Sequence, residues 1–196
     1  MKNSFDLREH DTYLNIVDVA ERLFAGVGFQ KTTVADIAHE LHMSPANVYR
    51  FFSSKAEINE AVGRRLLSEI ETTVGDIVRQ SDSARQRLRE IVIAIREAFA
   101  QRLRSNRKLF ELVETAFNEN WPIVHEHVEK LDKSLGEVIA QGAREGEFHV
   151  SDPELAAMLV RSACLQFCHP RLMLEREQEP EPTVDQMIDF CLAALG

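Results

Sequence analysis

Apolar residues recur at helical spacing along almost the whole chain. Between Asp11 and Val27, for example, they stand three or four positions apart, which is the period of one face of an α-helix. No stretch alternates convincingly between apolar and polar residues, as a half-buried strand does. The pattern predicts an all-α fold of about nine helices, expected over residues 11–27, 33–41, 44–51, 54–78, 83–103, 107–117, 121–146, 152–175 and 183–195.

Residues at the expected helix ends support this division. Gly28 can supply a left-handed cap after the first helix. Thr33 and Ser54 each precede an acidic residue by three positions, which is the pattern of a capping box or a shorter relative of it. Ser44 is followed by proline, a favourable helix start because serine caps free amides and proline needs no hydrogen bond there. The acidic, proline-containing segment Arg176–Pro182, "REQEPEP", predicts a loop before the last helix.

Composition indicates the cellular compartment of the protein. Hydrophobic residues make up 44% of the 196 residues, which is enough for a packed core, and only 8 glycines and 6 prolines are present. The first ten residues are charged rather than apolar, and no apolar run is long enough to span a bilayer, so we expect no signal peptide and no membrane partner. Three cysteines, an odd number, suit a reducing compartment. We therefore expect a cytoplasmic protein.

The segment of residues 42–55, "HMSPANVYRFFSSK", predicts a helix–turn–helix element despite a formal net charge of -9 for the chain. A short helix, a tight turn and a second short helix form the geometry that presents the second helix to the major groove of DNA. On a helical wheel, Val48, Phe51 and Phe52 share one side, which can pack on the preceding helix. The opposite side and its flanks carry polar or small residues: Ala46, Asn47, Tyr49 and Arg50.

These outward groups suit DNA recognition. Arginine can bond guanine and asparagine can bond adenine, whereas tyrosine can bind a phosphate oxygen. Free amides at the helix starts near Thr33 and Ser54, with Lys55 beside the latter, are expected phosphate sites. Residues 31–55 carry three basic and two acidic side chains, which indicates a local contact surface and not a basic domain. A capped amphipathic turn is also common in helical proteins, so these features alone leave a purely structural role open.

The segment Ile16–Val62 resembles the tetracycline-repressor (TetR) family of bacterial one-component transcriptional regulators. The matching features follow one another in the family's order: Ala20, Leu23-Phe24, Gly28-Phe29, Thr32-Thr33-Val34, Ile37-Ala38, Ser44, Val48-Tyr49, Phe52 and Lys55. The resemblance implies a three-helix DNA-binding head, residues 1–56, and a helical ligand-binding and dimerisation domain, residues 57–196. It also implies three partners: a palindromic double-stranded DNA operator, a second copy of the chain and a small-molecule effector whose identity the sequence does not give.

The resemblance further implies which residues contact DNA. Thr33 and Lys55 would bind phosphates, and the residues on or beside the recognition helix would be Ser44, Pro45, Ala46, Asn47, Tyr49 and Arg50. The sequence departs from the family at His42, where glycine is frequent in the turn, and at Pro45-Ala46, which replace the more usual basic residue and glycine. These departures concern operator preference, which the resemblance leaves open.

The helix expected over residues 152–175 is apolar nearly all round, as a helix buried on two sides would be. One of its sides carries small residues that allow close helix approach, and we assign this side to the dimer interface: Ala157, Val160, Cys164 and Cys168. As an alternative, Cys164 and Cys168 could form a redox or metal sensor. His169 points elsewhere on the wheel and no second Cys/His pair has zinc spacing, so we predict neither a metal site nor a cofactor.

An effector cavity is expected between the long central helices. Its candidate wall residues combine aromatic surfaces with a few polar groups: Phe99, Phe110, Phe117, Trp121, Gln166 and His169. The alternative for the aromatic residues is plain core packing. His125 and His127 stand two positions apart, which places them on neighbouring rather than stacked positions, and we expect them to be solvated or isolated.

The chain has neither a glycine-rich phosphate loop nor a nucleophile–base motif, so we do not expect an enzyme. The sequence predicts a homodimeric regulator, by family resemblance most often a repressor, that a small molecule releases from its operator. The alternative is a helical small-molecule-binding or interaction protein with weak or lost DNA binding.

Overall fold

The computed structural model describes residues 4–175 and 182–196, and within these ranges the chain forms ten helices and no strand. The predicted all-α fold is confirmed. Except for Pro182, the predicted loop Arg176–Pro182 lies outside the described residues. The helices are α1 (Ser4–Val27), α2 (Val34–Glu40), α3 (Pro45–Val48), α4 (Lys55–Val78), α5 (Ala84–Ser105), α6 (Arg107–Asn118), α7 (Pro122–Glu145), α8 (Pro153–Cys168), α9 (Pro170–Leu174) and α10 (Val184–Leu195).

The helix predicted over residues 152–175 is in fact two helices, α8 and α9. His169 between them leaves the helical conformation, with φ −93° and ψ 124°. The cause is local, because the ring of a following proline disfavours the helical conformation of the residue before it. Pro170 then begins α9, where its missing N–H is not needed.

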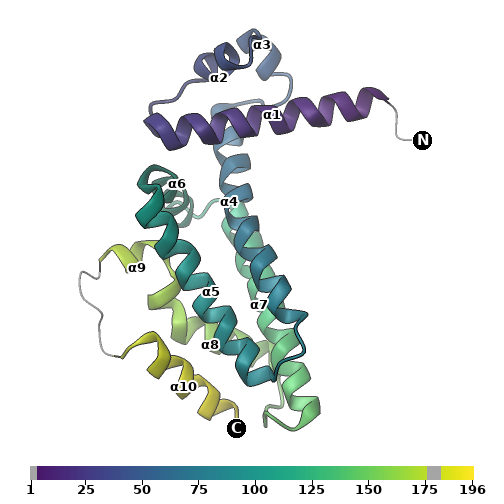
Figure 1. Ribbon diagram of the computed structural model, residues 1–196, viewed down its shortest axis with the longest axis vertical. Coiled ribbons are helices and arrows are strands. Elements are labelled where there is room, and N and C mark those ends of the chain that lie inside the picture. Colours follow the sequence, from purple (N-terminus) through teal and green to yellow (C-terminus); the bar gives the residue numbers. More distant parts are fainter. Residues whose placement is uncertain (1–3, 176–181) are drawn as a thin grey trace.

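Helices α1, α2 and α3 form a head at one end of the molecule, with α1 lying across the top of α4 (Figure 1). Apolar side chains of α1, among them Ile16, Ala20 and Phe24, are fully buried, as are Ile37 of α2 and Val48 of α3. The rings of Tyr13 and Phe52 stack at a centroid distance of 4.7 Å, which adds a contact between α1 and the turn after α3. The helical periodicity therefore places the apolar residues where the sequence predicts them.

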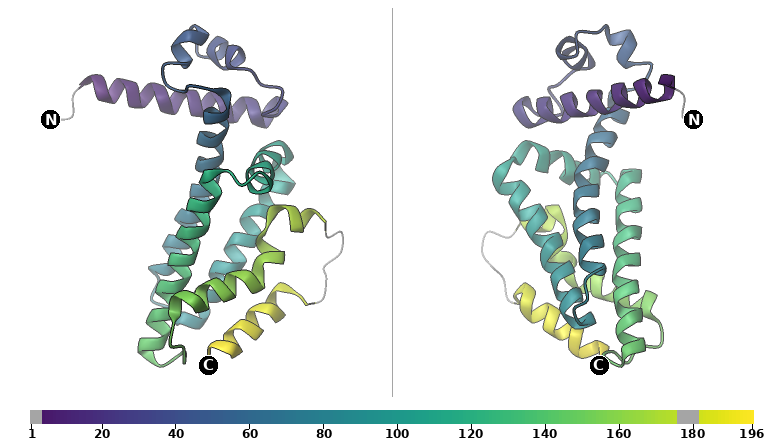
Figure 2. Two further views of the ribbon diagram at one scale, coloured as in Figure 1. Left: turned by 180° about the vertical axis from the view of Figure 1, so that it is seen from behind. Right: turned by 45° about the vertical axis from the view of Figure 1, so that its right-hand side comes forward.

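Helix α4 leaves the head and continues far down the molecule between α5 and α7 (Figure 2). The predicted boundary between residues 56 and 57 falls in its first turn, so one continuous helix serves both parts of the chain. Helix α8 packs on α7, and α10 packs on α8 and α5 at the end opposite the head. The buried apolar residues form one connected cluster that reaches from Ile16 to Leu195. No helix in the described part of the chain is both long enough and apolar enough to cross a membrane.

The turn between α2 and α3 depends on a left-handed residue that is not glycine. His42 has φ +53°, and the amides on either side of the turn close it: His42 N–H donates to His39 O at 3.0 Å and Met43 N–H to Ala38 O at 2.9 Å. Gly28 has φ +95°, which confirms the predicted left-handed cap of α1. The left-handed region disfavours a residue with a Cβ, so His42 introduces strain where the family often has glycine.

We predict that His42→Gly raises the free energy of unfolding by up to about 1 kcal/mol, because it removes this strain. His42→Val should lower it by about 1–2 kcal/mol, because a β-branched side chain tolerates the left-handed region least. Urea unfolding followed by circular dichroism measures both changes. His39→Val is the matched control, since His39 is exposed in α2 and the two residue types have similar helix propensity. Equal stability of the Gly and Val variants at position 42 would contradict the prediction.

Candidate nucleic-acid interface and internal cavity

The outer surface of the head is built around α3. Ser44 caps this helix, its Oγ accepting the Asn47 N–H at 3.2 Å, and Pro45 is the first helical residue. Val48 is fully buried and Phe52 is 3% exposed, so they fix the side of α3 that faces inward. The predicted DNA-contacting residues of this segment are consequently turned outward: Ser44, Pro45, Ala46, Tyr49 and Arg50 are exposed and Asn47 is half-buried.

Neighbouring side chains already hold Asn47 in place. Its Oδ1 lies 3.5 Å from Arg50 Nη1, and its Nδ2 lies 3.8 Å from Met43 Sδ. Tyr49 has half of its surface exposed. The surface thus offers one phenol, one guanidinium and one partly engaged amide, which are groups able to bond base edges and phosphates.

At the start of α2, two of the backbone amides have partners within the helix itself. Thr33 N–H donates to Asp36 Oδ2 at 2.7 Å, and Thr33 Oγ1 accepts the Asp36 N–H at 3.1 Å, which completes a capping box. Hydrogen bonds from the Thr33 side chain and backbone hold the pKa of Asp36 below its usual value. The amide of Thr33 is therefore not free for a phosphate, because the first turn of the helix satisfies it internally.

A similar arrangement occurs at the start of α4. Ser54 Oγ accepts the Glu57 N–H at 3.2 Å, while the Glu57 carboxylate accepts Ser53 N–H at 2.7 Å and also bonds the Ser53 hydroxyl. Lys55 reaches across to the α1–α2 connection and donates from Nζ to Gln30 O at 3.0 Å. Lys55 thus ties the start of α4 to the α1–α2 connection and also supplies a positive charge that acts on Asp36.

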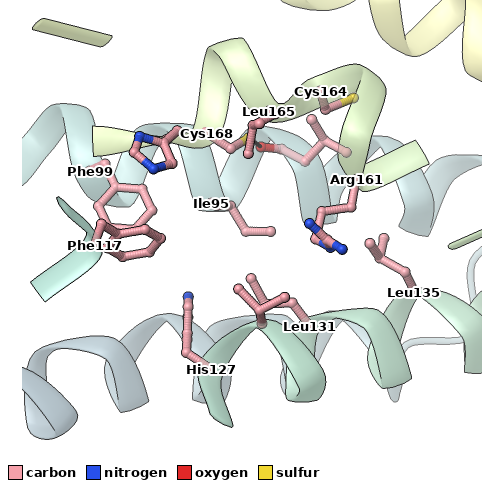
Figure 3. A pocket seen from close by; sticks show the side chains of 13 residues that line it. Ile95, Phe99, Phe117, His127, Leu131, Leu135, Arg161, Cys164, Leu165 and Cys168 are labelled. Carbon is pink, nitrogen blue, oxygen red and sulfur yellow. Dashed lines mark hydrogen bonds between the residues drawn. The ribbon is translucent and has the colours of Figure 1, made fainter. Parts of the chain in front are cut away.

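A cavity of about 60 Å³ lies between α5, α6, α7 and α8 (Figure 3). Three of the six residues predicted to line it do so: Phe99, Phe117 and His169. The other three are not among its lining residues, and this corrects the prediction for them. Phe110 is buried elsewhere in the core, Trp121 precedes α7 and donates from Nε1 to Glu119 Oε2 at 2.9 Å, and Gln166 lies outside the cavity wall.

His127 is the most consequential lining residue that the sequence did not predict. The expectation that it is solvated or isolated is wrong, because its side chain is 1% exposed. Its Nδ1 lies 3.0 Å from Glu71 Oε1, and the other oxygen of Glu71 accepts Lys130 Nζ at 2.7 Å. Glu71 belongs to α4 and His127 to α7, so this contact joins the cavity wall to the helix that leads to the head. His125, by contrast, is exposed as expected.

Two further polar groups line the cavity. Arg161 donates from Nε to Asp132 Oδ1 at 2.5 Å and extends between Leu131 and Leu135 (Figure 3). His169 lies at the break between α8 and α9, and burial followed by the nearby Arg171 charge lowers the pKa of its ring. Within the described residues, neither His127 Nε2 nor His169 Nδ1 has a hydrogen-bond partner.

The side of α8 assigned to a dimer contact faces the protein interior. Ala157, Val160 and Cys164 are at most 4% exposed, and the thiol of Cys168 donates to Val92 O of α5 at 3.8 Å. Ala157, Val160 and Cys164 thus have almost no surface for a partner chain and Cys168 is half-buried, and the assignment is corrected accordingly. The opposite side of α8 is the exposed one, and its large apolar side chains are Leu155, Met158, Leu159 and Leu165.

The cysteine geometry also differs from the sensor alternative. The thiol next to Cys164 is that of Cys191 in α10, and their hydrogen bond together with burial raises the pKa of Cys164. Burial raises the pKa of Cys168 to about 12. Both thiols are therefore protonated and weakly nucleophilic at neutral pH. In residues 4–175 and 182–196, no group of three or more His, Cys, Asp or Glu side chains is arranged to hold a metal ion.

Two family models match this chain. One, described as "Bacterial regulatory proteins, tetR family", matches residues 16–62, and the other, "Tetracyclin repressor-like, C-terminal domain", matches residues 84–187. Among curated sequences, a protein described as "Uncharacterized HTH-type transcriptional regulator YhgD", from Bacillus subtilis (strain 168), is 25% identical over 153 residues. That match covers 74% of this chain and 76% of YhgD.

Solved structures share the fold. A transcriptional regulator of the TetR/AcrR family from Thermobifida fusca YX-ER1 superposes with a TM-score of 0.66 at 20% identity, over 94% of this chain and 96% of that one. RolR, solved in complex with resorcinol, superposes with a TM-score of 0.65 at 14% identity, over 97% of this chain and 90% of that one. At these identities the likeness concerns the fold alone.

The bond between Glu71 and His127 leads to a prediction about stability. Burial raises the pKa of Glu71, but hydrogen bonds from His127 and Lys130 outweigh it and hold this pKa below the usual 4.5. Glu71→Gln should therefore lower the free energy of unfolding at neutral pH by about 1–2 kcal/mol. A carboxylate with a lowered pKa stabilises the fold above its ordinary pKa and loses this effect as the pH falls below it, so the difference from wild type should shrink between about pH 5 and about pH 3.

Urea unfolding at several pH values measures this difference. Glu137→Gln is the matched control, because Glu137 is exposed on α7 and should contribute little at any of these pH values. A gap between wild type and Glu71→Gln that widens below about pH 4 would contradict the prediction.

Proposed function

The chain belongs to the tetR family of bacterial regulatory proteins and is a helix–turn–helix transcriptional regulator, and from this premise we propose that it is a homodimeric repressor released from its operator by a small molecule. The repressor acts in the cytoplasm and has no catalytic role. The observation that carries the DNA-binding part is the orientation of α3. Val48 and Phe52 are buried on one side of this segment, and this leaves Tyr49 and Arg50 exposed. Helix α3 lies at the end of the molecule opposite α10 (Figure 1).

The distribution of exposed apolar residues supports pairing of two chains. Among the described residues, nine large hydrophobic side chains are exposed, and five of them lie on α8 and α10: Leu155, Met158, Leu159, Leu165 and Phe190. Packing these helices on their symmetry mates removes this apolar surface from water. The two heads then face half-sites about 34–36 Å apart, the spacing of successive major grooves.

The path of α4 supports control by a ligand. This helix starts at Lys55 in the head and carries Glu71, which contacts His127 in the cavity wall. A ligand that alters the packing of α7 against α4 thus acts on the element that positions the head. Resorcinol in RolR illustrates that a protein of this fold can bind a single-ring compound. Release follows when the ligand binds a conformation whose heads no longer match the operator.

We predict that Arg50→Ala and Tyr49→Ala each lower the affinity for the specific operator by roughly 10- to 100-fold, because each removes a group that bonds a base edge or a phosphate. A mobility shift with DNA from upstream of the chain's own gene measures the effect. Arg79→Ala is the matched control, since Arg79 is also exposed but lies at the far end of α4, paired with Asp76. The circular dichroism spectra of all variants should match that of wild type.

Lys55→Ala distinguishes a phosphate contact from base reading in the same assay. It should weaken binding to all DNA sequences and lower the slope of log K against log salt by the equivalent of about one phosphate contact. Arg50→Ala, by contrast, should weaken binding to the operator more than binding to other sequences. If wild type binds no DNA from this region, or if Arg50→Ala and Tyr49→Ala bind as wild type does, the DNA-binding proposal fails. A ligand-binding protein that has lost DNA binding would then be the better description.

We predict that Leu159→Glu dissociates the dimer, because it places a charge in the centre of the exposed apolar face of α8, where the side chain is 61% exposed. Sedimentation velocity at micromolar concentration should show a monomer for this variant and a dimer for wild type. Val27→Glu is the control, because Val27 is similarly exposed at the end of α1, away from this face. A Leu159→Glu variant that stays dimeric would place the interface elsewhere.

A further inference from the structure

One ring nitrogen of His127 is oriented for a ligand rather than for the protein. The His127 side chain points from α7 into the cavity (Figure 3), it is 1% exposed, and no described protein group bonds its Nε2. Its Nδ1 faces the Glu71 carboxylate at 3.0 Å. An ionised carboxylate only accepts hydrogen bonds, so Nδ1 carries a hydrogen, and in the tautomer whose single N–H is at Nδ1 the other nitrogen, Nε2, accepts. The cavity wall therefore contains a buried acceptor that requires an N–H or O–H donor.

The rest of the wall indicates what such a donor is attached to. Phe117 contacts both histidine rings edge-to-face, at centroid distances of 6.4 Å to His127 and 5.1 Å to His169, and it contacts Phe99 in the same way at 6.0 Å. Leu131 and Leu135 continue the apolar surface. A second nitrogen without a described protein partner, His169 Nδ1, belongs to the ring that Phe117 contacts. The wall is thus apolar and largely aromatic, with few polar positions. A water molecule can donate a hydrogen bond to the acceptor but makes no apolar contact with the wall, whereas a ring with a hydroxyl does both.

The charges around the cavity favour a neutral ligand. Arg161 is paired with Asp132 at 2.5 Å, and Glu71 is bonded by both His127 and Lys130. Arg161, which lines the cavity, and Glu71, which lies behind His127, each have a counter-charge, so an ionised ligand would be buried without compensation.

Size sets a further limit. The cavity volume of about 60 Å³ is smaller than the ~150 Å³ of a cavity that encloses benzene, so even one ring requires the helices to separate. A ligand of this size binds a more open conformation and shifts the population toward it.

From these observations we propose that the cavity binds a small neutral compound, one apolar ring carrying a hydroxyl, which donates its O–H to His127 Nε2. The inference rests on the proposed function in taking this cavity as the effector site. It goes beyond that function by assigning the chemical class of the ligand and the residue that recognises it. His127 is the residue that discriminates between a hydroxylated ring and an apolar ring of the same size.

Calorimetric titration of the full chain without DNA tests the ligand class. Phenol is the probe, and toluene is its control because a methyl group replaces the hydroxyl at nearly the same size. We expect phenol to bind about tenfold more tightly than toluene, the effect of one buried hydrogen bond, and to bind more tightly than benzoate, which is charged. Equal affinity for phenol and toluene, tighter binding of benzoate, or no binding of phenol would each overturn the proposal.

Two variants at His127 locate the hydrogen bond. His127→Asn keeps a donor near the Nδ1 position toward Glu71 and removes the acceptor at Nε2, so the preference for phenol over toluene should fall to about onefold. His127→Gln places an acceptor near the Nε2 position and should restore part of the preference. His125→Asn is the matched control, two residues away and exposed, and should keep the full preference. A full preference in His127→Asn would overturn the assignment of His127.

A measurement on the wild type covers the case in which the His127 variants do not fold. Phenol should shift the ¹⁵N resonance of His127 Nε2, and toluene should not; an unchanged resonance would overturn the proposal. A mobility shift with the operator in the presence of phenol then tests the proposed function separately. If phenol binds with the expected preference but leaves operator binding unchanged, effector control fails and the ligand assignment stands.

Discussion

The buried face of α4 is the contact on which the rest of the structure depends. This helix extends from the head to the far end of the second part, and its apolar residues, including Ile58, Leu66 and Ile77, are buried along its whole length. Burying each such side chain stabilises the fold by about 1.5–3 kcal/mol. The fit is close, because a Cβ on Gly63 would lie 2.8 Å from Ile123 Cδ1 of α7. A change in how α7 packs against α4 therefore alters contacts along much of α4 and not only at one residue.

The polar contacts of α4 also result from its position between the head and α7. Arg65 pairs with Asp18 of α1 at the head end, and Glu71 contacts His127 and Lys130 of α7 further down. The pair at the head end is exposed and contributes little to stability. Glu71 and His127 are largely buried and His127 lines the cavity, so in our proposal a ligand there contacts a hydrogen-bonded pair whose other member lies on α4. In our proposal, coupling between the cavity and the head requires only helices that are already in contact.

The acidity of the chain has a local explanation in the head. Asp36 and Glu57 cap the helix starts at which phosphates were expected, and each carboxylate is held by backbone and hydroxyl donors. Their negative charges serve helix stability at the cost of phosphate affinity. With only three basic residues between positions 31 and 55, Lys55, Arg50 and the exposed Tyr49 carry more of the DNA contact in our proposal than they would in a basic domain.

Much of the fold could be predicted from the sequence because it depends on short-range interactions. The periodicity predicts the helices, and the caps at Thr33, Ser44 and Gly28 form as expected because a cap bonds residues three or four positions away. The outward orientation of Arg50 follows for the same reason, since Val48 and Phe52 lie on the opposite side of one short segment. The break at His169 was missed even though its signal is local, namely the following Pro170.

Tertiary structure alone decided which surface of each helix meets which neighbour. A helical wheel separates the two sides of α8 but gives no reason why Cys164 faces inward and Leu159 outward, because both sides are apolar. The same limit explains Phe110 and His127, whose surroundings come from helices remote in sequence. The partner of His127 is Glu71, 56 residues away, and only the packing of α4 against α7 brings an imidazole and a carboxylate into contact beside a cavity.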